Sequence, residues 1–309
     1  RDGTGTDTNT YFWIWNDIYP LDQALSLGYT GSDYLEPGFR FAASFLKIFT
    51  DSSIVFFTAM AAATLGFLYA GLKKFERLDL FLALALYLMI FYMPYTLNAM
   101  RQALAMSIFI YVLPYLLIGD LKRTLVWTLL AASIHATGVL ILIAYFIART
   151  KVNFIWFIAI GLFCSFLVNI FNMPERIVDL IAPGKFGLFV DKWGEVTGVQ
   201  IAIRLFILLL FVFMSRYIFK DWWYSRIVQI YSLGLFMYIS FADASMIAAR
   251  FNLFFRVLEV VLFSVVVASS KKLHSRLLCF SAAAFLGGYT FYLNLLNEDN
   301  NYVSVFLGL

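Results

Sequence analysis

Long, uninterrupted runs of apolar residues constrain the fold of this chain more than any other feature. Hydrophobic residues make up 62% of its 309 residues and charged residues only 14%, whereas about a quarter of the residues in a soluble domain are charged. The runs extend over roughly 17–24 residues, long enough to cross a bilayer as helices, and they lack the period-two alternation of strands. The sequence therefore predicts an all-α, polytopic helical bundle in a membrane. The predicted segments are residues 54–72, 80–97, 102–118, 124–147, 152–171, 199–219, 227–241, 251–268 and 277–296.

The connections between these segments differ in charge. Lysine and arginine mark the cytoplasmic side of a membrane protein, so the short basic connections are predicted to be cytoplasmic. These connections contain Lys73, Lys74 and Arg77; Lys122 and Arg123; Arg149 and Lys151; Arg216, Lys220 and Arg226; and Lys271, Lys272 and Arg276. The longer or more acidic connections are predicted to face outside. They are residues 1–51, 172–198, 243–250 and 297–301.

The segment at 124–147 does not fit a simple alternation of sides. Basic residues both precede and follow it, at 122–123 and at 149–151, so a single crossing would place every later basic connection outside. A segment that enters the membrane and turns back keeps all of them cytoplasmic. We therefore predict a re-entrant or broken helix pair with its turn near residues 133–138, SIHATG, and with His135 at the tip. One ordinary span is the alternative, because the charge rule is a bias.

We expect a single membrane domain over residues 1–309. Residues 1–51 are predicted to form an outer-face loop, with turn signals such as Pro20 and a surface helix near residues 39–49. Residues 172–198 are predicted to form a second outer-face loop. The chain starts at Arg1 without a methionine, which gives the expectation that a membrane helix precedes it.

Ionisable residues inside a membrane are costly and usually functional. Arg204 lies within an apolar run, Arg101 and Arg250 lie at outer helix ends, and His135 lies at the predicted hairpin tip. Guanidinium groups match phosphate oxygens with paired hydrogen bonds. The pattern therefore favours a cationic cavity for a phosphate-bearing lipid headgroup. Each residue also has a structural interpretation: the outer arginines as interfacial anchors, Arg204 and Arg256 neutralised by an acidic neighbour, and His135 as a core histidine.

Several standard catalytic motifs are missing from the sequence. It has no phosphate-binding loop with a following lysine, no H-E-x-x-H motif and no G-x-S-x-G motif. The outside loops hold no Asp-x-Asp pair, which disfavours a metal-dependent glycosyltransferase. Cys164 and Cys279 both lie in apolar runs and are predicted to be packing residues. We therefore expect no metal, no cofactor and no nucleic-acid partner.

Four stretches occur in an order that resembles the EpsG family of Wzy-type polysaccharide polymerases. They are RDGTGTDTNTY at the start of the chain, EPGF at 36–39, NAMRQALAMSI at 98–108 and KRTLVWTLLAASIHATGVLIL at 122–142. The resemblance covers roughly the first half of the chain and weakens after residue 171, where only ARFNLFF at 249–255 is similar.

The resemblance implies a GT-C-like protein of the bacterial inner membrane that acts at the periplasmic face. Such enzymes take polyprenyl-diphosphate-linked oligosaccharides and transfer the growing glycan to the next lipid-linked unit, without a metal or nucleotide. A chain-length regulator protein is an implied partner. An O-antigen ligase that moves lipid-linked glycan onto lipid A core, and a flippase for lipid-linked glycan, are the alternatives.

The resemblance also implies roles for individual residues. The family's diphosphate-binding arginines correspond to Arg1, Arg101 and Arg250, to which the intramembrane Arg204 adds a candidate. The departing diphosphate needs charge stabilisation, and the acceptor hydroxyl needs a proton acceptor. His135 is expected to serve as that base or to orient the acceptor, while Asp7 and Glu36 could instead act as base or pair with arginines. The residues expected to contact sugar are Tyr11, Trp13 and Gln102, although the two aromatic residues would equally suit a membrane-interface belt.

Overall fold

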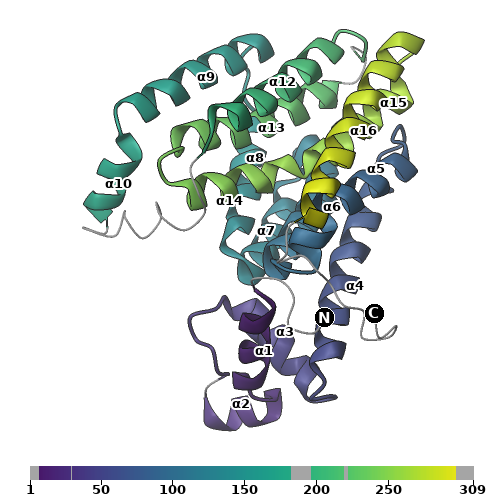
Figure 1. Ribbon diagram of the computed structural model, residues 1–309. Coiled ribbons are helices and arrows are strands. Elements are labelled where there is room, and N and C mark those ends of the chain that lie inside the picture. Colours follow the sequence, from purple (N-terminus) through teal and green to yellow (C-terminus); the bar gives the residue numbers. More distant parts are fainter. Residues whose placement is uncertain (1–6, 29, 182–195, 219–221, 297–309) are drawn as a thin grey trace.

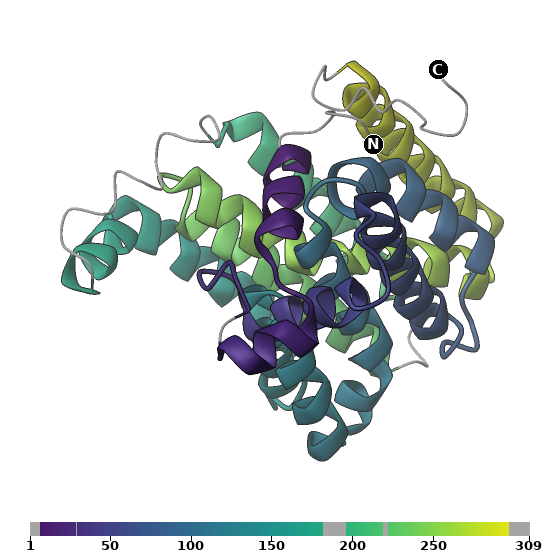
Figure 2. The ribbon, with the colours of Figure 1, turned by 90° about the horizontal axis from the view of Figure 1, so that it is seen from below.

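The computed structural model describes residues 7–28, 30–181, 196–218 and 222–296, and every regular element in these ranges is a helix. The N-terminal helices form a small unit at one end of a larger bundle (Figures 1 and 2). The bundle elements are α4 (Ser53–Leu72), α5 (Leu80–Tyr87), the π-helix η1 (Leu88–Thr96), α6 (Met100–Ile118), α7 (Leu121–Ile134), the 3₁₀ turn η2 (Ala136–Val139), α8 (Leu140–Ala148), α9 (Phe154–Ile170), α10 (Met173–Ile181), α12 (Gly198–Met214), α13 (Trp222–Ser240), α14 (Ser245–Arg256), α15 (Leu258–Ser269) and α16 (Leu273–Leu296).

The class predicted from the apolar runs is confirmed. Among the described residues, four helices are long and apolar enough to cross a membrane: α4, α6, the continuous pair α14–α15, and α16. Shorter apolar helices occur at 80–96, 136–148, 154–170 and 198–214. The α6 and α15 helices are buried on most sides, whereas α4 and α16 expose apolar side chains along much of their length. The exposed apolar surface is the one that lipid would cover.

The N-terminal unit contains three helices, α1 (Thr8–Asp17), α2 (Leu21–Leu27) and α3 (Pro37–Lys47), in a stretch expected to be a loop with one helix. The expected surface helix near 39–49 is α3. Helices as short as α1 and α2 are marginal in isolation, so tertiary packing stabilises them. The Trp15 ring stacks on Phe56 of α4 at 4.7 Å, and its Nε1 donates to the Asp51 carbonyl at 2.9 Å.

The helix pair at α7 and α8 has the predicted break. His135 has extended backbone between the two helices, and the 3₁₀ turn follows it directly. The Arg149 guanidinium, just after α8, donates to the carbonyls of Leu116 and Leu117 at the end of α6. Because α7 begins only a few residues after α6 ends, α8 returns to the end of the bundle at which α7 started. The segment is therefore a re-entrant pair.

Close packing at the tip depends on Gly138. A β-carbon at this position would overlap the backbone of Ala131 and Ala132 in α7, with the Ala131 carbonyl oxygen only 2.7 Å away. A side chain would separate the 3₁₀ turn from α7, so the glycine in SIHATG is required by this turn.

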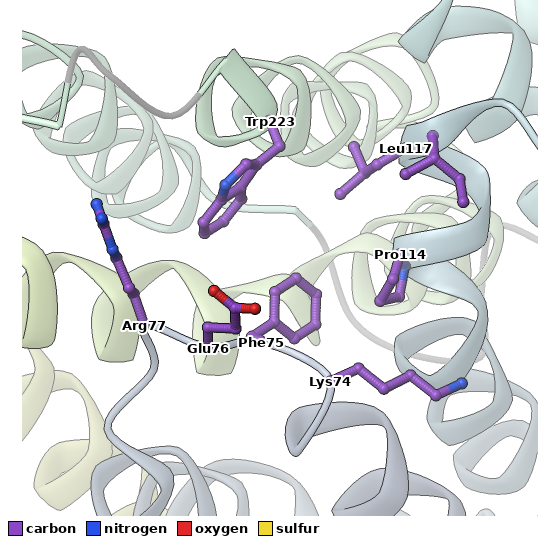
Figure 3. Close-up of a pocket in the computed structure, with 8 residues that line it drawn as sticks. Lys74, Phe75, Glu76, Arg77, Pro114, Leu117 and Trp223 are labelled. Atoms are coloured by element: carbon purple, nitrogen blue, oxygen red, sulfur yellow. The ribbon is translucent and has the colours of Figure 1, made fainter.

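The basic connections meet at the end of the bundle opposite the N-terminal unit. Lys74 donates to the Tyr111 carbonyl near the end of α6 at 3.0 Å, and Arg226 in α13 donates to the Thr150 carbonyl after α8 at 2.7 Å. A pocket of about 310 Å³ is lined there by residues 74–77, the end of α6 and Trp223 of α13 (Figure 3). We call this end the basic end.

Cysteine labelling tests the re-entrant pair. Lys122 and Lys151 are exposed and flank α7 and α8. We expect Lys122→Cys and Lys151→Cys, each in a Cys164→Ser background because Cys164 is exposed, to react with an impermeant maleimide from the same side. Trp13→Cys, on the N-terminal unit and 75% exposed, should react from the other side. Labelling of Lys122→Cys and Lys151→Cys from opposite sides would contradict the hairpin.

Candidate functional site

Three of the sequence motifs meet through the carboxylate of Glu36. Glu36 lies at the N-terminus of α3, and its Oε2 pairs with Nη1 of Arg101 in the first turn of α6. Its Oε1 accepts the backbone N–H of Ala136 at the hairpin tip, at 3.0 Å. One side chain thus joins the N-terminal unit, α6 and the re-entrant pair. We call Asp7, Glu36, Arg101, His135 and Arg250 the junction cluster.

Arg101 is held from several directions. Its guanidinium lies 6.0 Å from the centre of the Tyr11 ring and 5.5 Å from that of Phe39, and its Nε donates to the Tyr11 hydroxyl at 3.4 Å. The side chain remains 22% exposed. Packing against two rings and one carboxylate fixes the guanidinium direction while part of it can still reach a ligand.

Glu36 is ionised in this setting. Burial disfavours its charged form, but its own backbone N–H, Arg101 and the Ala136 N–H outweigh burial and lower the pKa of this carboxyl below its ordinary value. A group with a lowered pKa stabilises the folded state above its unfolded pKa and loses that contribution as the pH falls. The Glu36–Arg101 pair is therefore intact at neutral pH.

Contacts with Thr137 determine which ring nitrogen of His135 carries the proton. Its Nδ1 accepts the backbone N–H of Thr137 at 3.2 Å and lies 2.7 Å from the Thr137 hydroxyl oxygen. A backbone N–H can only donate, so Nδ1 carries the lone pair, and the proton of the neutral ring is on Nε2. The free edge of His135 is then a hydrogen-bond donor.

Asp7 is connected to the rest of the junction cluster through Asn98, just before α6. Its backbone N–H donates to the Asn98 side-chain oxygen at 2.9 Å, which ties the first motif to the NAMRQ motif. The Asp7 carboxylate acts electrostatically on Tyr11 and has no hydrogen-bond partner among the described residues.

Arg250 presents its guanidinium openly. It lies in α14, where its carbonyl accepts Gln102 Nε2 at 3.1 Å, and the residue is exposed. Within the described part of the chain its guanidinium has no hydrogen-bond or ion-pair partner. It acts electrostatically on His135, so it belongs to the same cluster.

The structure corrects the predicted connection around Arg250. Arg250 was expected in a loop at 243–250, but α14 already begins at Ser245, and this loop prediction was wrong. Small polar residues such as the buried Ser245 and Asn252 allow close packing between helices there.

The structure places the remaining sequence candidates differently. Tyr11 and Gln102 are 4% and 5% exposed and bond within the protein, so they support Arg101 and α14 rather than present a free face for sugar. Trp13 lies two residues from Tyr11 on α1 and is exposed. Arg204 lies beside Tyr238, outside the cluster. Arg1 lies outside the described residues, as do residues 182–195 of the predicted second loop, whose first part is α10.

Sequence reasoning missed three supporting residues. Asn98 positions Asp7, Thr137 orients His135, and Ser133 packs against Gly38. The available signal was their presence inside the recognised motifs. No group of three metal-ligating side chains occurs among the described residues, so no metal position is assigned to the junction cluster.

Replacing Gly38 should weaken the packing of α3 against α7. A β-carbon at Gly38 would overlap the Ser133 side chain and lie 2.9 Å from its carbonyl oxygen, which would push α3 away from α7. We expect Gly38→Val to cost about 1–3 kcal/mol and to lower chain extension, because Glu36 would lose Ala136. Thermal unfolding and extension assays measure both effects. Gly66→Val is the matched control, since Gly66 of α4 has nothing within 4 Å of its β-carbon position. Equal stability of the two variants would contradict this packing.

Comparison with known proteins identifies one family. Searches against curated proteins and against solved structures gave no match. The model of the EpsG family matches residues 1–306, nearly the whole chain. The match extends well beyond the four motifs in the first half of the sequence. The chain therefore belongs to the EpsG family of Wzy-like polysaccharide polymerases.

Proposed function

We propose that the protein transfers a growing glycan from its polyprenyl diphosphate carrier onto the next lipid-linked repeat unit. The observation that carries this proposal is the Arg250 guanidinium, which is exposed, has no partner among the described residues and acts electrostatically on His135. Arg250 with an open guanidinium and Arg101 with a fixed one both act electrostatically on His135, and two such groups suit an anion with several oxygens, as in a diphosphate.

The chemistry demands charge stabilisation more than activation of the donor. Breaking the bond between sugar and diphosphate leaves negative charge on the leaving diphosphate, and cations already in place stabilise that charge without reorganisation. Arg250 supplies a guanidinium whose N–H groups are free to bind two oxygens. Arg101 supplies a second, more rigid one, because Glu36 and the two rings fix its direction.

In this proposal His135 and Asp7 have different roles in binding and deprotonating the acceptor hydroxyl. With Nδ1 occupied by Thr137, His135 donates from Nε2 and orients a substrate oxygen. The proton of the attacking hydroxyl then needs another acceptor. Both oxygens of Glu36 are engaged, whereas the Asp7 carboxylate has no hydrogen-bond partner among the described residues. Asp7 is therefore the proposed base, and Glu36 is a positioning residue.

The proposed location is the bacterial inner membrane with the junction cluster on the periplasmic side. The supporting observation is that Lys74, Arg149 and Arg226 gather at the basic end, opposite the N-terminal unit, and basic ends face the cytoplasm. A chain-length regulator protein stays a predicted partner.

A lipid-exchange experiment tests the direction of transfer. The donor carries a preformed glycan on a long polyprenyl chain, and the acceptor carries one repeat unit on a short chain. We expect the extended glycan to appear on the short lipid, with release of the long polyprenyl diphosphate. Growth on the long lipid would contradict the proposed direction. Transfer only to added lipid A core would indicate a ligase, and unchanged lipids would indicate a transporter.

A further inference from the structure

A polar pocket lies in the N-terminal unit, where α1 and α3 end and α2 begins. Figure 1 shows α2 on the side of this unit that faces away from the bundle. The pocket has a volume of about 500 Å³, and its polar lining residues are Asn16, Tyr19, Asp22, Gln23, Lys47 and Asp51. Small-ligand pockets of about 300–1,000 Å³ are usually lined mostly by apolar side chains. The lining of this pocket, which we call the α2 pocket, therefore indicates a polar ligand.

The helices α1 and α3 connect the α2 pocket to the junction cluster. Near their starts, the ring centres of Tyr11 and Phe39 lie 6.2 Å apart. Near their ends, the Lys47 ammonium donates to the Trp15 carbonyl at 2.6 Å. The two helices therefore run side by side in the same direction, from the junction cluster to the pocket.

The pocket is separate from the junction cluster. Asp7 and Asn16 are nine residues apart along α1, which at 1.5 Å per residue is about 14 Å. Glu36 and Lys47 are eleven residues apart along α3, or about 17 Å. A hydrogen bond spans about 3 Å, so a small group bound in the pocket does not contact Asp7 or Glu36.

The pocket also lies farther from the basic end than the junction cluster does. Asp51 of the pocket lies two residues before Ser53, where α4 starts, and Gly71 near the end of α4 packs against the backbone of Tyr111 in α6. From this contact Ser53 is 18 residues away, about 27 Å, whereas Arg101 is ten residues away, about 15 Å. A chain that runs from the junction cluster to the pocket therefore runs away from the basic end.

Lys47 shapes the pocket but is not free to bind a ligand. Its ammonium donates to the carbonyls of Trp15, Asn16 and Ile18 at 2.6, 3.3 and 2.6 Å. An ammonium has three N–H donors, so all of them are engaged at the end of α1. Among the described lining residues, the pocket therefore has no free cation for an anionic ligand.

Four polar side chains of the pocket remain free to bind a ligand: those of Asn16, Asp22, Gln23 and Asp51. They are exposed and make no hydrogen bond among the described residues. The two amides can both donate and accept, whereas the two carboxylates only accept. Hydroxyl groups, which donate and accept, match both kinds of side chain. A phosphate or carboxylate ligand would instead be repelled by the two carboxylates at short range.

The lining also offers apolar surface. Tyr19 and Ile48 are 40% and 45% exposed, and a tyrosine presents an apolar ring beside its hydroxyl. A sugar ring carries hydroxyl groups around its edge and C–H groups on its faces. An uncharged sugar therefore matches the polar and the apolar parts of the lining together.

We propose that the α2 pocket binds uncharged sugar residues of the growing glycan, at a distance from its diphosphate. This inference rests on the proposed function, because it places the diphosphate end of the glycan at the junction cluster. The glycan then extends along α1 and α3, and sugars farther along it enter the pocket. The amides of Asn16 and Gln23 bond to the sugar hydroxyls, and the carboxylates of Asp22 and Asp51 accept from them.

Such binding would keep the growing glycan on the protein between transfers. Each transfer releases the lipid that carried the glycan, and the elongated glycan must take up the donor position again. A second contact makes this rebinding intramolecular and raises the effective concentration of the glycan at the reaction site. The pocket is therefore expected to increase the length of the product and not the rate of a single transfer.

Binding of a lipid-free glycan tests the pocket. The probe is an oligosaccharide of two repeat units, made of uncharged sugars and released from its lipid, and calorimetry measures its affinity for the purified chain in detergent. We expect the double variant Asn16→Ala, Gln23→Ala to weaken binding by about tenfold or more, because two hydrogen-bonding side chains are lost. Arg250→Ala and an excess of inorganic pyrophosphate should leave binding unchanged, since both act at the junction cluster.

Product length gives the second readout. With lipid-linked repeat units as substrate, the double variant should form the first bond at the wild-type rate and yield clearly shorter glycans. Ser26→Ala is the control. Ser26 is exposed on α2 and its hydroxyl donates to the Gln23 carbonyl, so this variant perturbs α2 without removing a lining side chain. It should give glycans of wild-type length, and thermal unfolding checks that both variants are folded.

Four results would overturn the proposal. They are unchanged affinity in the double variant, displacement of the oligosaccharide by pyrophosphate, unchanged product length, and tighter binding of a matched oligosaccharide that contains acidic sugars. An equal loss of initial rate and of length would also overturn it, because the pocket would then belong to the reaction site. If the pocket binds the oligosaccharide but the wild type extends no glycan, the proposed function fails while the sugar-binding pocket stands.

Discussion

Arg250→Ala should abolish chain extension without unfolding the protein. The Arg250 guanidinium is exposed and pairs with nothing among the described residues, so its removal leaves no buried group unsatisfied. If it binds the departing diphosphate, its loss should lower the extension rate by about 10²–10³-fold, as does removal of other preorganised donors to a developing negative charge. Arg250→Lys should recover only part of the rate, because an ammonium cannot bind two oxygens as a fork.

The matched control is Arg123→Ala at the basic end. Arg123 is also exposed, and its side chain pairs with Asp120 at 3.4 Å and lies over the Tyr115 ring. Its variant should extend glycan at the wild-type rate. Initial rates of extension by the purified variants, with thermal unfolding as the check on folding, give the comparison. Equal rates for Arg250→Ala and Arg123→Ala would remove the basis for the diphosphate site.

Two substitutions of His135 should separate donation from proton abstraction. Gln can place its amide N–H where Nε2–H lies, whereas Asn can keep the acceptor to the Thr137 N–H and lose the donor at Nε2. If His135 orients substrate as a donor, His135→Gln should retain clearly more extension activity than His135→Asn. The difference should be about tenfold, comparable with one hydrogen bond of roughly 1–1.5 kcal/mol.

The outcome for a base role is different. Neither amide can accept a proton, so both variants would lose activity to the same low level and the remaining activity would be flat with pH. Asp7→Asn provides the complementary measurement. We expect it to remove most of the activity, because the amide cannot take the acceptor's proton, while its backbone N–H still bonds to Asn98. Full activity of Asp7→Asn would assign the base elsewhere.

The topology of the bundle was predictable because charge and apolar length are local properties of a sequence. Basic residues on both sides of 124–147 required a return to the same side, and the Arg149 contacts with Leu116 and Leu117 show that return. The motifs likewise located Glu36, Arg101 and His135, and these residues do meet in the structure.

Pairing within the cluster was not predictable, because it depends on side-chain direction in three dimensions. Nothing in the sequence shows that Tyr11 packs against Arg101 instead of facing solvent, or that Thr137 occupies Nδ1 of His135. Predicting that Arg204 lies apart from Arg250 would also have required the positions of the helices, because the sequence placed both arginines in one cavity. The short helices α1 and α2 were missed because packing, rather than their own periodicity, stabilises them.

The central claim is that this chain alone extends lipid-linked glycan. Purified protein is incubated with a single lipid-linked repeat unit, and the number of repeat units on each lipid is read by mass spectrometry. We expect a ladder of two, three and more units, with one polyprenyl diphosphate released for each bond formed, and no ladder with Arg250→Ala. A substrate that stays at one repeat unit with the folded wild-type protein would contradict the account.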